Sequence, residues 1–316
     1  MNRRYFFLGS LGAGALALTS SCARRGVKLS AKQRVSIVRA ASYTKDLTDV
    51  IRRILVDHCV AVAGKRILLK PNLVEFSAQT PINTNPVFVA AVLEAFSGLG
   101  AASVRIAEGP GHRRMTLDMA DAAGFFSVVP GFEKRFTDLN TDDVQRVALA
   151  HPLSKLKELY LPNSVFDCDL LVSLPKMKTH HWAGATLSMK NLFGVVPGSV
   201  YGWPKNILHW CGIDESIVDL HYLFPRQFAI VDGIEAMEGN GPILGRSKHA
   251  GVIVAGAHPP SVDGTCCQIM QIDPEKIRYL TLIEDNWRTA TQTGETIASV
   301  ASAFALHPDL ENLRLK

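Results

Sequence analysis

Short β-rich runs alternate with helical patterns along most of this chain, and that alternation limits the possible folds more than any other feature. Runs typical of strands cover residues 35–39, 66–70, 103–107, 170–174, 228–231 and 252–256. Helical patterns lie between them, over residues 47–60, 86–97, 117–123, 207–223 and 261–270. Most of the strand runs are largely apolar, as the strands of a buried parallel sheet are. The sequence therefore predicts an α/β fold with a parallel or mixed sheet and helices on both faces.

The composition supports a single domain of this kind over residues 34–316. Hydrophobic residues make up 47% of the 316 residues and charged residues 20%, which excludes a disordered chain and provides enough apolar side chains for a core. Residues 133–161 are less regular, and we expect a partly β insertion there. The net charge of +5 includes Arg3 and Arg4, which lie in a predicted signal peptide, so the excess on the folded part is too mild to indicate nucleic-acid binding.

The first 22 residues have the organisation of a twin-arginine signal peptide. Arg3 and Arg4 precede an apolar stretch over residues 6–18, and small residues follow at positions 19–21. The stretch of about 13 residues is shorter than the roughly 20 that a membrane-spanning helix needs. We therefore expect the twin-arginine export machinery as a partner and a periplasmic location for the mature protein.

Cys22 leaves two forms of the mature N-terminus open. Residues 18–22 resemble the lipobox of a lipoprotein signal, in which the cysteine becomes the lipidated first residue, but Thr19 stands where leucine is usual. The basic residues that follow, within 23–33, are typical of a flexible tether. Contact with the membrane is therefore expected only through the signal peptide or through a lipid anchor on Cys22.

Polar residues follow four of the predicted strands at the point where each strand ends. They are Lys70 and Asn72 after the second run, Glu108 after the third, Lys176, Lys178, His180 and His181 after the fourth, and Asp232 after the fifth. In an open α/β sheet, ligands bind outside the carboxyl ends of the strands. We therefore expect these side chains to converge on one edge of the sheet and to form a polar ligand site.

The segment 176–191 contains the largest group of candidate ligand-binding residues. Lys176, Lys178 and Lys190 are interspersed with His180 and His181, and Asn191 follows directly. Lysine binds carboxylate and phosphate groups as a point charge, and a helix beginning near Ala185 would add N-terminal amides. The segment predicts an anion site, in which Lys70, Asn72, Lys176, Lys178, Lys190 and Asn191 bind the substrate.

The same residues leave a metal site open as an alternative. His180 and His181 supply imidazole nitrogens, and Glu108 and Asp232 supply oxygens, which is a ligand set that divalent metals accept. The histidines lack the helical spacing of the common zinc motifs. Cysteines 59, 168, 211, 266 and 267 contain no C-x-x-C pair, which argues against an iron–sulfur cluster.

Six ordered motifs give the chain a resemblance to the family called domain of unknown function 362. They are Lys70-Pro71-Asn72, Thr84-Asn85-Pro86, Glu108-Gly109, residues 174–180, residues 190–194 and residues 232–242. The resemblance covers roughly residues 35–283 and implies a fold and a site, since no general reaction is established for the family. Some similar proteins carry a ferredoxin-like iron–sulfur segment, but this chain has no such cysteine cluster.

These observations predict an exported enzyme that acts on a small anionic substrate, with or without the assistance of a metal. Glu108, His180 and Asp232 are the candidates for proton transfer, and His180 is expected to be a base with an ordinary pKa near neutrality. Two alternatives remain open from the sequence. One is a noncatalytic periplasmic binding protein for an anion or cofactor, and the other is a redox accessory protein that carries a metal.

Overall fold

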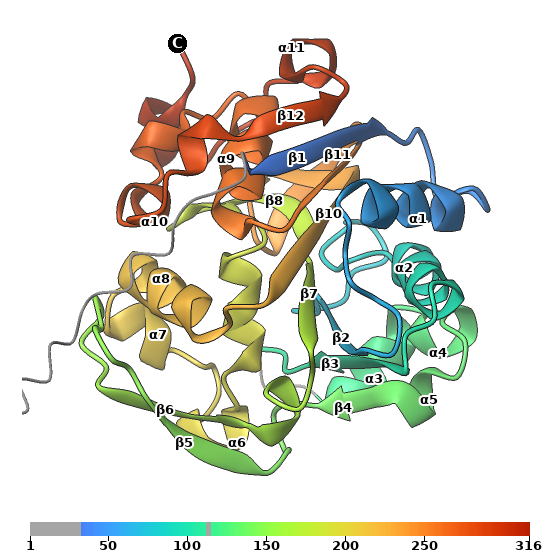
Figure 1. The fold of residues 1–316 in the computed structure, drawn as a ribbon. Helices are drawn as coiled ribbons and strands as arrows, with labels where there is room; N and C mark the ends of the chain where they lie inside the picture. The colour runs from blue at the N-terminus through green and yellow to red at the C-terminus, as the bar shows by residue number, and fades with distance from the viewer. Residues whose placement is uncertain (1–32, 112–114) are drawn as a thin grey trace, which may run out of the picture. The chain divides into compact units, whose positions relative to one another are not determined.

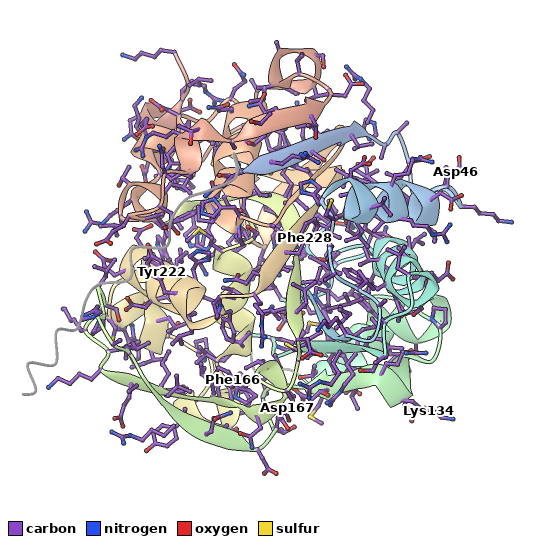
Figure 2. The ribbon with its side chains drawn as sticks, viewed as in Figure 1. Asp46, Lys134, Phe166, Asp167, Tyr222 and Phe228 are labelled. Atoms are coloured by element: carbon purple, nitrogen blue, oxygen red, sulfur yellow. The ribbon has the colours of Figure 1, made fainter. Side chains whose placement is uncertain are left out.

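The computed structural model describes residues 33–111 and 115–316, which belong to one compact unit. The predicted signal peptide, Cys22, nearly all of the predicted tether and His112 lie outside the described residues. Figure 2 shows the packing of the described side chains, with Phe228 in the interior and Asp46 and Lys134 at the surface. Among the described helices, none combines the length and the apolar composition that crossing a membrane requires.

A mixed sheet, ten-stranded within the described residues, forms the centre of the fold (Figure 1). Its strand order is β12 (Thr291–Gly294), β1 (Arg34–Arg39), β11 (Leu244–Gly256), β10 (Gln227–Asn240), β7 (Leu170–Leu174), β2 (Arg66–Pro71), β3 (Ser103–Glu108) and β4 (Phe136–Asp138). β8 (Lys176–His180) pairs with β10 and with β9 (Gly184–Thr186). The run from β10 to β4 is parallel, so the carboxyl ends of β7, β2 and β3 share one edge.

Helices cover both faces of this sheet, as the sequence predicts (Figure 1). One side carries α1 (Leu47–Asp57), α2 (Pro86–Gly98), α3 (Thr116–Ala122), α4 (Phe125–Val128) and α5 (Phe132–Arg135). The other carries α8 (Ile213–Leu223), α9 (Pro259–Ile269) and α10 (Arg278–Thr281). The short helices α6 (Gly198–Tyr201), α7 (Ile207–Trp210) and α11 (Ile297–Val300) complete the set, and β5 (Val144–Ala148) pairs with β6 (Glu158–Pro162) apart from the main sheet.

The apolar strand runs are explained by this double coverage. Successive side chains of a strand point to opposite faces of the sheet. In β10, Ile230 packs into the core that contains α1 and α2, whereas Ala229 and Val231 pack into the core that contains α8 and α9. A strand that is buried on both faces needs apolar residues at every position, which is the pattern that the sequence shows.

Three local predictions are wrong, and each error has a physical reason. β10 does not end at Val231 but continues to Asn240, because Asp232 is neutralised inside the sheet by Lys176. The helix expected near Ala185 is instead strand β9, followed by a 3₁₀ helix over Lys190–Val195. The single helix expected over residues 207–223 is divided into α7 and α8 at Gly212, whose positive φ of 108° glycine adopts readily.

Candidate functional site

A cavity of about 610 Å³ lies at the carboxyl edge formed by β2 and β3, against β8 and β9. That volume is typical of small-molecule sites. Seven of the residues predicted from the sequence line it, namely Asn72, Glu108, Lys178, His180, His181, Lys190 and Asn191. The structure therefore brings together the ends of β2 and β3 and the segment that follows β7, whereas Lys70, Lys176 and Asp232 are absent from the cavity lining.

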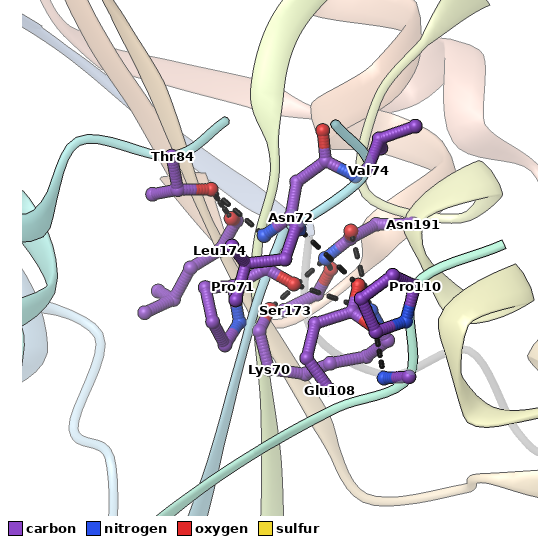
Figure 3. Close-up of polar contacts among 12 residues, drawn as sticks. Lys70, Pro71, Asn72, Val74, Thr84, Glu108, Pro110, Ser173, Leu174 and Asn191 are labelled. Carbon is purple, nitrogen blue, oxygen red and sulfur yellow. Dashed lines mark hydrogen bonds and ion pairs between the residues drawn. The ribbon is translucent and has the colours of Figure 1, made fainter. Parts of the chain in front are cut away.

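Lys70 and Glu108 form a buried ion pair (Figure 3), and Glu108 belongs to the lining of the cavity. The Lys70 Nζ lies 2.7 Å from Glu108 Oε1 and 3.4 Å from Asn191 Oδ1. The amide nitrogen of Asn191 in turn donates to the Lys70 carbonyl at 3.0 Å and to Ser173 Oγ at 3.1 Å. Burial lowers the pKa of Lys70, and the charge of Glu108 opposes that shift. The carboxylate of Glu108 is therefore neutralised by a residue of the protein itself.

Gly194 allows this pair to be covered closely. A Cβ atom at position 194 would overlap both carboxylate oxygens of Glu108 and the Nζ of Lys70. Glycine is required here by the close approach of the backbone, and the 3₁₀ helix that contains Gly194 forms one wall of the cavity.

Lys176 and Asp232 form a second buried ion pair, which lies outside the cavity lining. Their charged atoms are 2.6 Å apart, and the Tyr43 hydroxyl donates to Asp232 at 2.9 Å and accepts from Lys176 at 2.9 Å. Asp232 also accepts from the backbone nitrogens of Asn85 at 3.0 Å and Ile234 at 3.3 Å. The structure thus places these two predicted site residues in a closed network that joins β8, β10 and the start of α2.

Lys178 reaches the cavity without a carboxylate partner among the described residues. Its Nζ donates to Asn72 Oδ1 at 2.7 Å, to the Ile82 carbonyl at 2.8 Å and to the Pro242 carbonyl at 3.3 Å. Burial lowers its pKa well below the ordinary value, and the charges of Lys176 and Lys190 lower it further. The amine therefore has three neutral oxygens as partners and no carboxylate within ion-pair distance among the described residues.

Lys205 is a cavity residue that the sequence analysis missed. Its Nζ donates to the carbonyls of Gly109 and Val196 and to Asn140 Oδ1, the last at 3.2 Å. Burial lowers its pKa to about 7. Lys205 follows no strand and belongs to a loop between α6 and α7, so a search of strand ends could not find it. The preceding Gly202-Trp203-Pro204 turn was the only local signal.

Lys190 opens the 3₁₀ helix and has no carboxylate within ion-pair distance among the described residues. The backbone nitrogens of Ser188 and Met189 donate to Asp263 of α9 at 2.8 and 3.1 Å, which fixes the segment directly before it. The Lys190 Nζ lies 3.5 Å from the centroid of the Phe193 ring. Burial lowers the pKa of Lys190 to about 7.

His180 is buried with a defined hydrogen-bond pattern. Its Nδ1 accepts from the backbone nitrogens of Trp182 at 3.1 Å and Ala183 at 3.2 Å, so the neutral ring carries its proton on Nε2. Burial lowers its pKa well below the ordinary value, and the charge of Lys190 contributes in the same direction. The expectation of an ordinary pKa for His180 is therefore wrong, and the ring is a neutral N–H donor near pH 7.

Further polar atoms at the cavity complete its chemistry. His181 donates from Nδ1 to the Gly241 carbonyl at 2.7 Å, which leaves Nε2 as an acceptor. His209 Nδ1 and Thr186 Oγ1 are buried without a hydrogen-bond partner in the described part of the chain. Burial also lowers the pKa of His209 to about 4. Unpaired buried polar atoms are rare in folded proteins, so these two are available to a ligand or to water.

In residues 33–111 and 115–316, no group of three or more His, Cys, Asp or Glu side chains lies close enough together to hold a metal ion. Among the candidates, His180 and His181 are adjacent with ring centroids 5.1 Å apart. Glu108 is bound to Lys70, and Asp232 lies outside the cavity lining. The four candidates therefore do not form a ligand cluster, although Glu108, His180 and His181 line the same cavity.

Known proteins resemble the chain to different extents. A thylakoid-associated protein of Synechocystis sp. is 27% identical over 257 residues, covering 77% of this chain and 76% of its own. The lactate racemase apoprotein of Thermoanaerobacterium thermosaccharolyticum matches with a TM-score of 0.47 and 14% identity over 75% of this chain, which spans 57% of that protein. A protein from Thermotoga maritima matches with a TM-score of 0.39 and 11% identity, covering 72% of this chain and 59% of its own.

A protein-family model matches more than half of the chain. The family described as Domain of unknown function (DUF362) matches residues 67–268, a range that contains β3, β7, β8, all of β2 except its first residue, and both buried ion pairs. The resemblance inferred from the six motifs is thereby confirmed, and the chain belongs to the DUF362 family.

Proposed function

We propose that this protein is an enzyme that binds a small carboxylate- or phosphate-bearing substrate in the cavity at the carboxyl edge of the sheet. One observation carries the proposal. Lys178, Lys190 and Lys205 all line the cavity, and none has a carboxylate within ion-pair distance among the described residues. Glu108, which also lines it, is already neutralised by Lys70. An anion supplies the missing countercharge.

The energetics support binding of an anion over binding of a neutral ligand. A buried charge is costly unless it is paired, and the lowered pKa values of the three lysines express that cost. A bound anion favours the charged form of each amine and raises its pKa. Binding near pH 7 to 8 should therefore be accompanied by uptake of protons from solution.

The lowered pKa values of the cavity lysines favour an enzyme over a binding protein without catalytic activity. Two amines with a pKa of about 7 are poised to exchange protons at neutral pH. His180, with its proton on Nε2, is suited to donating a hydrogen bond to a substrate oxygen. Glu108 and Asp232 would then position Lys70 and Lys176 and would not act on the substrate directly.

Isothermal titration calorimetry of the full-length protein with oxalate and with phosphate tests the proposal. Titration in buffers of different ionisation enthalpy should reveal net proton uptake. Replacing Lys205→Met should weaken binding about 10- to 100-fold, because a charge-assisted hydrogen bond contributes about 1.5 to 3 kcal/mol. Lys134→Met at the surface is the matched control and should leave affinity unchanged (Figure 2).

Two results would decide against the proposal or its catalytic part. Equal affinity in wild type and Lys205→Met, with both proteins folded, removes the cavity as the anion site. Saturable binding of a substrate that is never converted, across a screen of carboxylated and phosphorylated metabolites, favours the noncatalytic binding protein. A redox accessory protein would instead require a stoichiometric metal in native mass spectra.

We also propose that the protein is exported, to the periplasm or to a lipid anchor at the membrane. The twin-arginine pattern at Arg3 and Arg4 and the lipobox-like residues before Cys22 support this location. The thylakoid association of the Synechocystis relative is consistent with it. Replacing both arginines with lysine should retain the precursor in the cytoplasm, and unchanged fractionation would contradict export by this route.

A further inference from the structure

The lysines at the site differ in how their amines are engaged. Lys70 and Lys176 are ion-paired, and Lys178 and Lys205 each donate to three oxygens. Lys190 is the exception among these five, because no described residue accepts a hydrogen bond from its Nζ. Its neighbour is the face of Phe193, 3.5 Å away. The amine can therefore react without first losing a set of hydrogen bonds.

The surroundings of Lys190 bring the pKa of its amine close to neutral pH. Burial is the largest cause of its lowered pKa, the charges of Lys70 and Lys205 lower it further, and Asp214 of α8 opposes them. Lys178, His180 and His209 also face it, since the charge of Lys190 shifts the pKa of each. The Phe193 face favours the ammonium form. With a pKa of about 7, roughly half of the amine is neutral at pH 7, against about one in three thousand for an ordinary lysine.

We propose that Lys190 is a nucleophile that forms an imine with a carbonyl group of an anionic substrate, such as a 2-oxo acid or an aldehyde that carries a carboxylate or phosphate. The inference rests on the proposed function of the cavity, because Lys178 and Lys205 would bind the anionic group. It goes further by assigning the class of substrate and the bond that is made.

The step is balanced without any further reactant. The lone pair of the Lys190 Nζ attacks the carbonyl carbon, and the C–O π bond breaks to give a carbinolamine. One proton passes from the nitrogen to the oxygen as the carbinolamine forms. The second nitrogen proton then leaves with the hydroxyl group as water, the remaining C–O bond breaks, and the C=N bond forms. The Nε2–H of His180 is a neutral donor for the carbonyl oxygen, and the unpaired Thr186 hydroxyl lines the same cavity. Hydrolysis by the reverse path releases the substrate.

Reductive trapping tests the inference on the full-length protein. Glyoxylate and pyruvate are each incubated with the protein and sodium cyanoborohydride at pH 7, and the adducts are located by peptide mass spectrometry. We expect the reduced adduct at Lys190 to form about tenfold or more faster than at exposed lysines, since the neutral fraction differs by about three orders of magnitude and lower basicity offsets part of that gain. Phosphate should compete with the reaction.

Lys190→Arg is the variant that keeps the charge and cannot form an imine. It should lose the adduct, and its thermal unfolding midpoint establishes that the variant is folded. Lys134→Arg, the same substitution at the surface, should leave labelling of position 190 unchanged. Labelling that is no faster at Lys190 than at Lys134 would overturn the inference, as would labelling of Lys178 or Lys205 in its place.

The two proposals fail in different ways. If oxalate and phosphate bind and the trapping reaction gives no adduct at Lys190, the anion site stands and the nucleophile is wrong. If Lys190 is labelled but neither anion binds or competes, the anion site is wrong. The calorimetric and trapping experiments therefore test separate statements.

Discussion

Substitutions in the pair Lys176–Asp232 can distinguish a structural role of these two residues from a catalytic one. Sequence position alone predicts Asp232 as a proton-transfer residue and Lys176 as a substrate-binding residue. The structure places both outside the cavity lining, at 1% and 0% exposure, with their charged atoms 2.6 Å apart. Asp232→Asn keeps the shape of the side chain and removes its charge, which leaves the Lys176 ammonium buried without a counterion.

The cost of that change follows from the burial of the pair. Removing one partner of a buried ion pair destabilises a protein by about 3 to 5 kcal/mol. A loss of this size corresponds to a fall in the unfolding midpoint on the order of 10 °C for a domain of this length. Replacing both partners, as Lys176→Met with Asp232→Leu, should recover part of the loss because no unpaired charge remains.

The effect of Asp232→Asn on stability should depend on pH in a definite direction. Burial lowers the pKa of Lys176 below its unfolded value of 10.5, so the unfolded chain binds more protons over the intervening range of pH. Stability therefore rises with pH wherever that difference persists. Without Asp232 the folded pKa falls further and the range widens. The deficit of Asp232→Asn relative to wild type should therefore be largest near neutral pH and should shrink toward pH 10.5.

Urea unfolding followed by circular dichroism at pH 6 and pH 9 provides the measurement. Glu158→Gln breaks the surface pair with Arg146 and is the control, for which we expect a midpoint close to wild type. A midpoint for Asp232→Asn equal to that of the control would refute the reasoning. So would a stable Asp232→Asn protein that no longer binds oxalate, since this result would place Asp232 in the ligand site.

Two further predictions concern the cavity itself. Gly194→Ala should destabilise the protein and weaken oxalate binding, because the added methyl group would overlap Glu108 and Lys70. Thermal unfolding and calorimetry measure the two effects. Wild-type stability together with wild-type affinity would contradict the prediction. Oxalate affinity should fall as pH rises through about 7, because Lys190 and Lys205 then lose their protons. The stability of the ligand-free protein should rise from about pH 7 toward 10.5, because over that range the unfolded chain binds more protons than the folded one. Lys205→Met should show a smaller rise of stability over that range, and an identical slope would contradict the lowered pKa.

The fold was largely accessible from the sequence because the strands are buried on both faces. Continuous apolar runs mark such strands, and all six predicted runs coincide with strands of the main sheet. The start of α2 was equally readable, since Asn85 caps the helix by accepting from the Val87 backbone nitrogen and Pro86 occupies its first turn. The short strands β8 and β9 are not predicted from the sequence, because β8 is rich in polar residues typical of a loop and β9 is only three residues long.

The site was accessible only in part, and the missing information was three-dimensional. The sequence places Lys70 and Glu108 near the ends of β2 and β3 and Lys178 in the segment after β7, and the structure brings these three side chains close to one edge of the sheet. It could not separate the lysines that are neutralised by a carboxylate from those that are not. It also could not place Lys205, which reaches the cavity from a loop between two short helices.

The geometry of β8 shows why that separation matters for function. Residues at alternate positions of a strand share one face, so Lys176, Lys178 and His180 form a row along β8. Asp232 neutralises the first of them, and Glu108 neutralises Lys70 on β2. Lys178 and His180 continue the row into the cavity with neutral partners only. The two carboxylates therefore make the burial of a cationic cluster tolerable, while the amines that face the cavity have no carboxylate partner among the described residues, a role that an anionic substrate can fill.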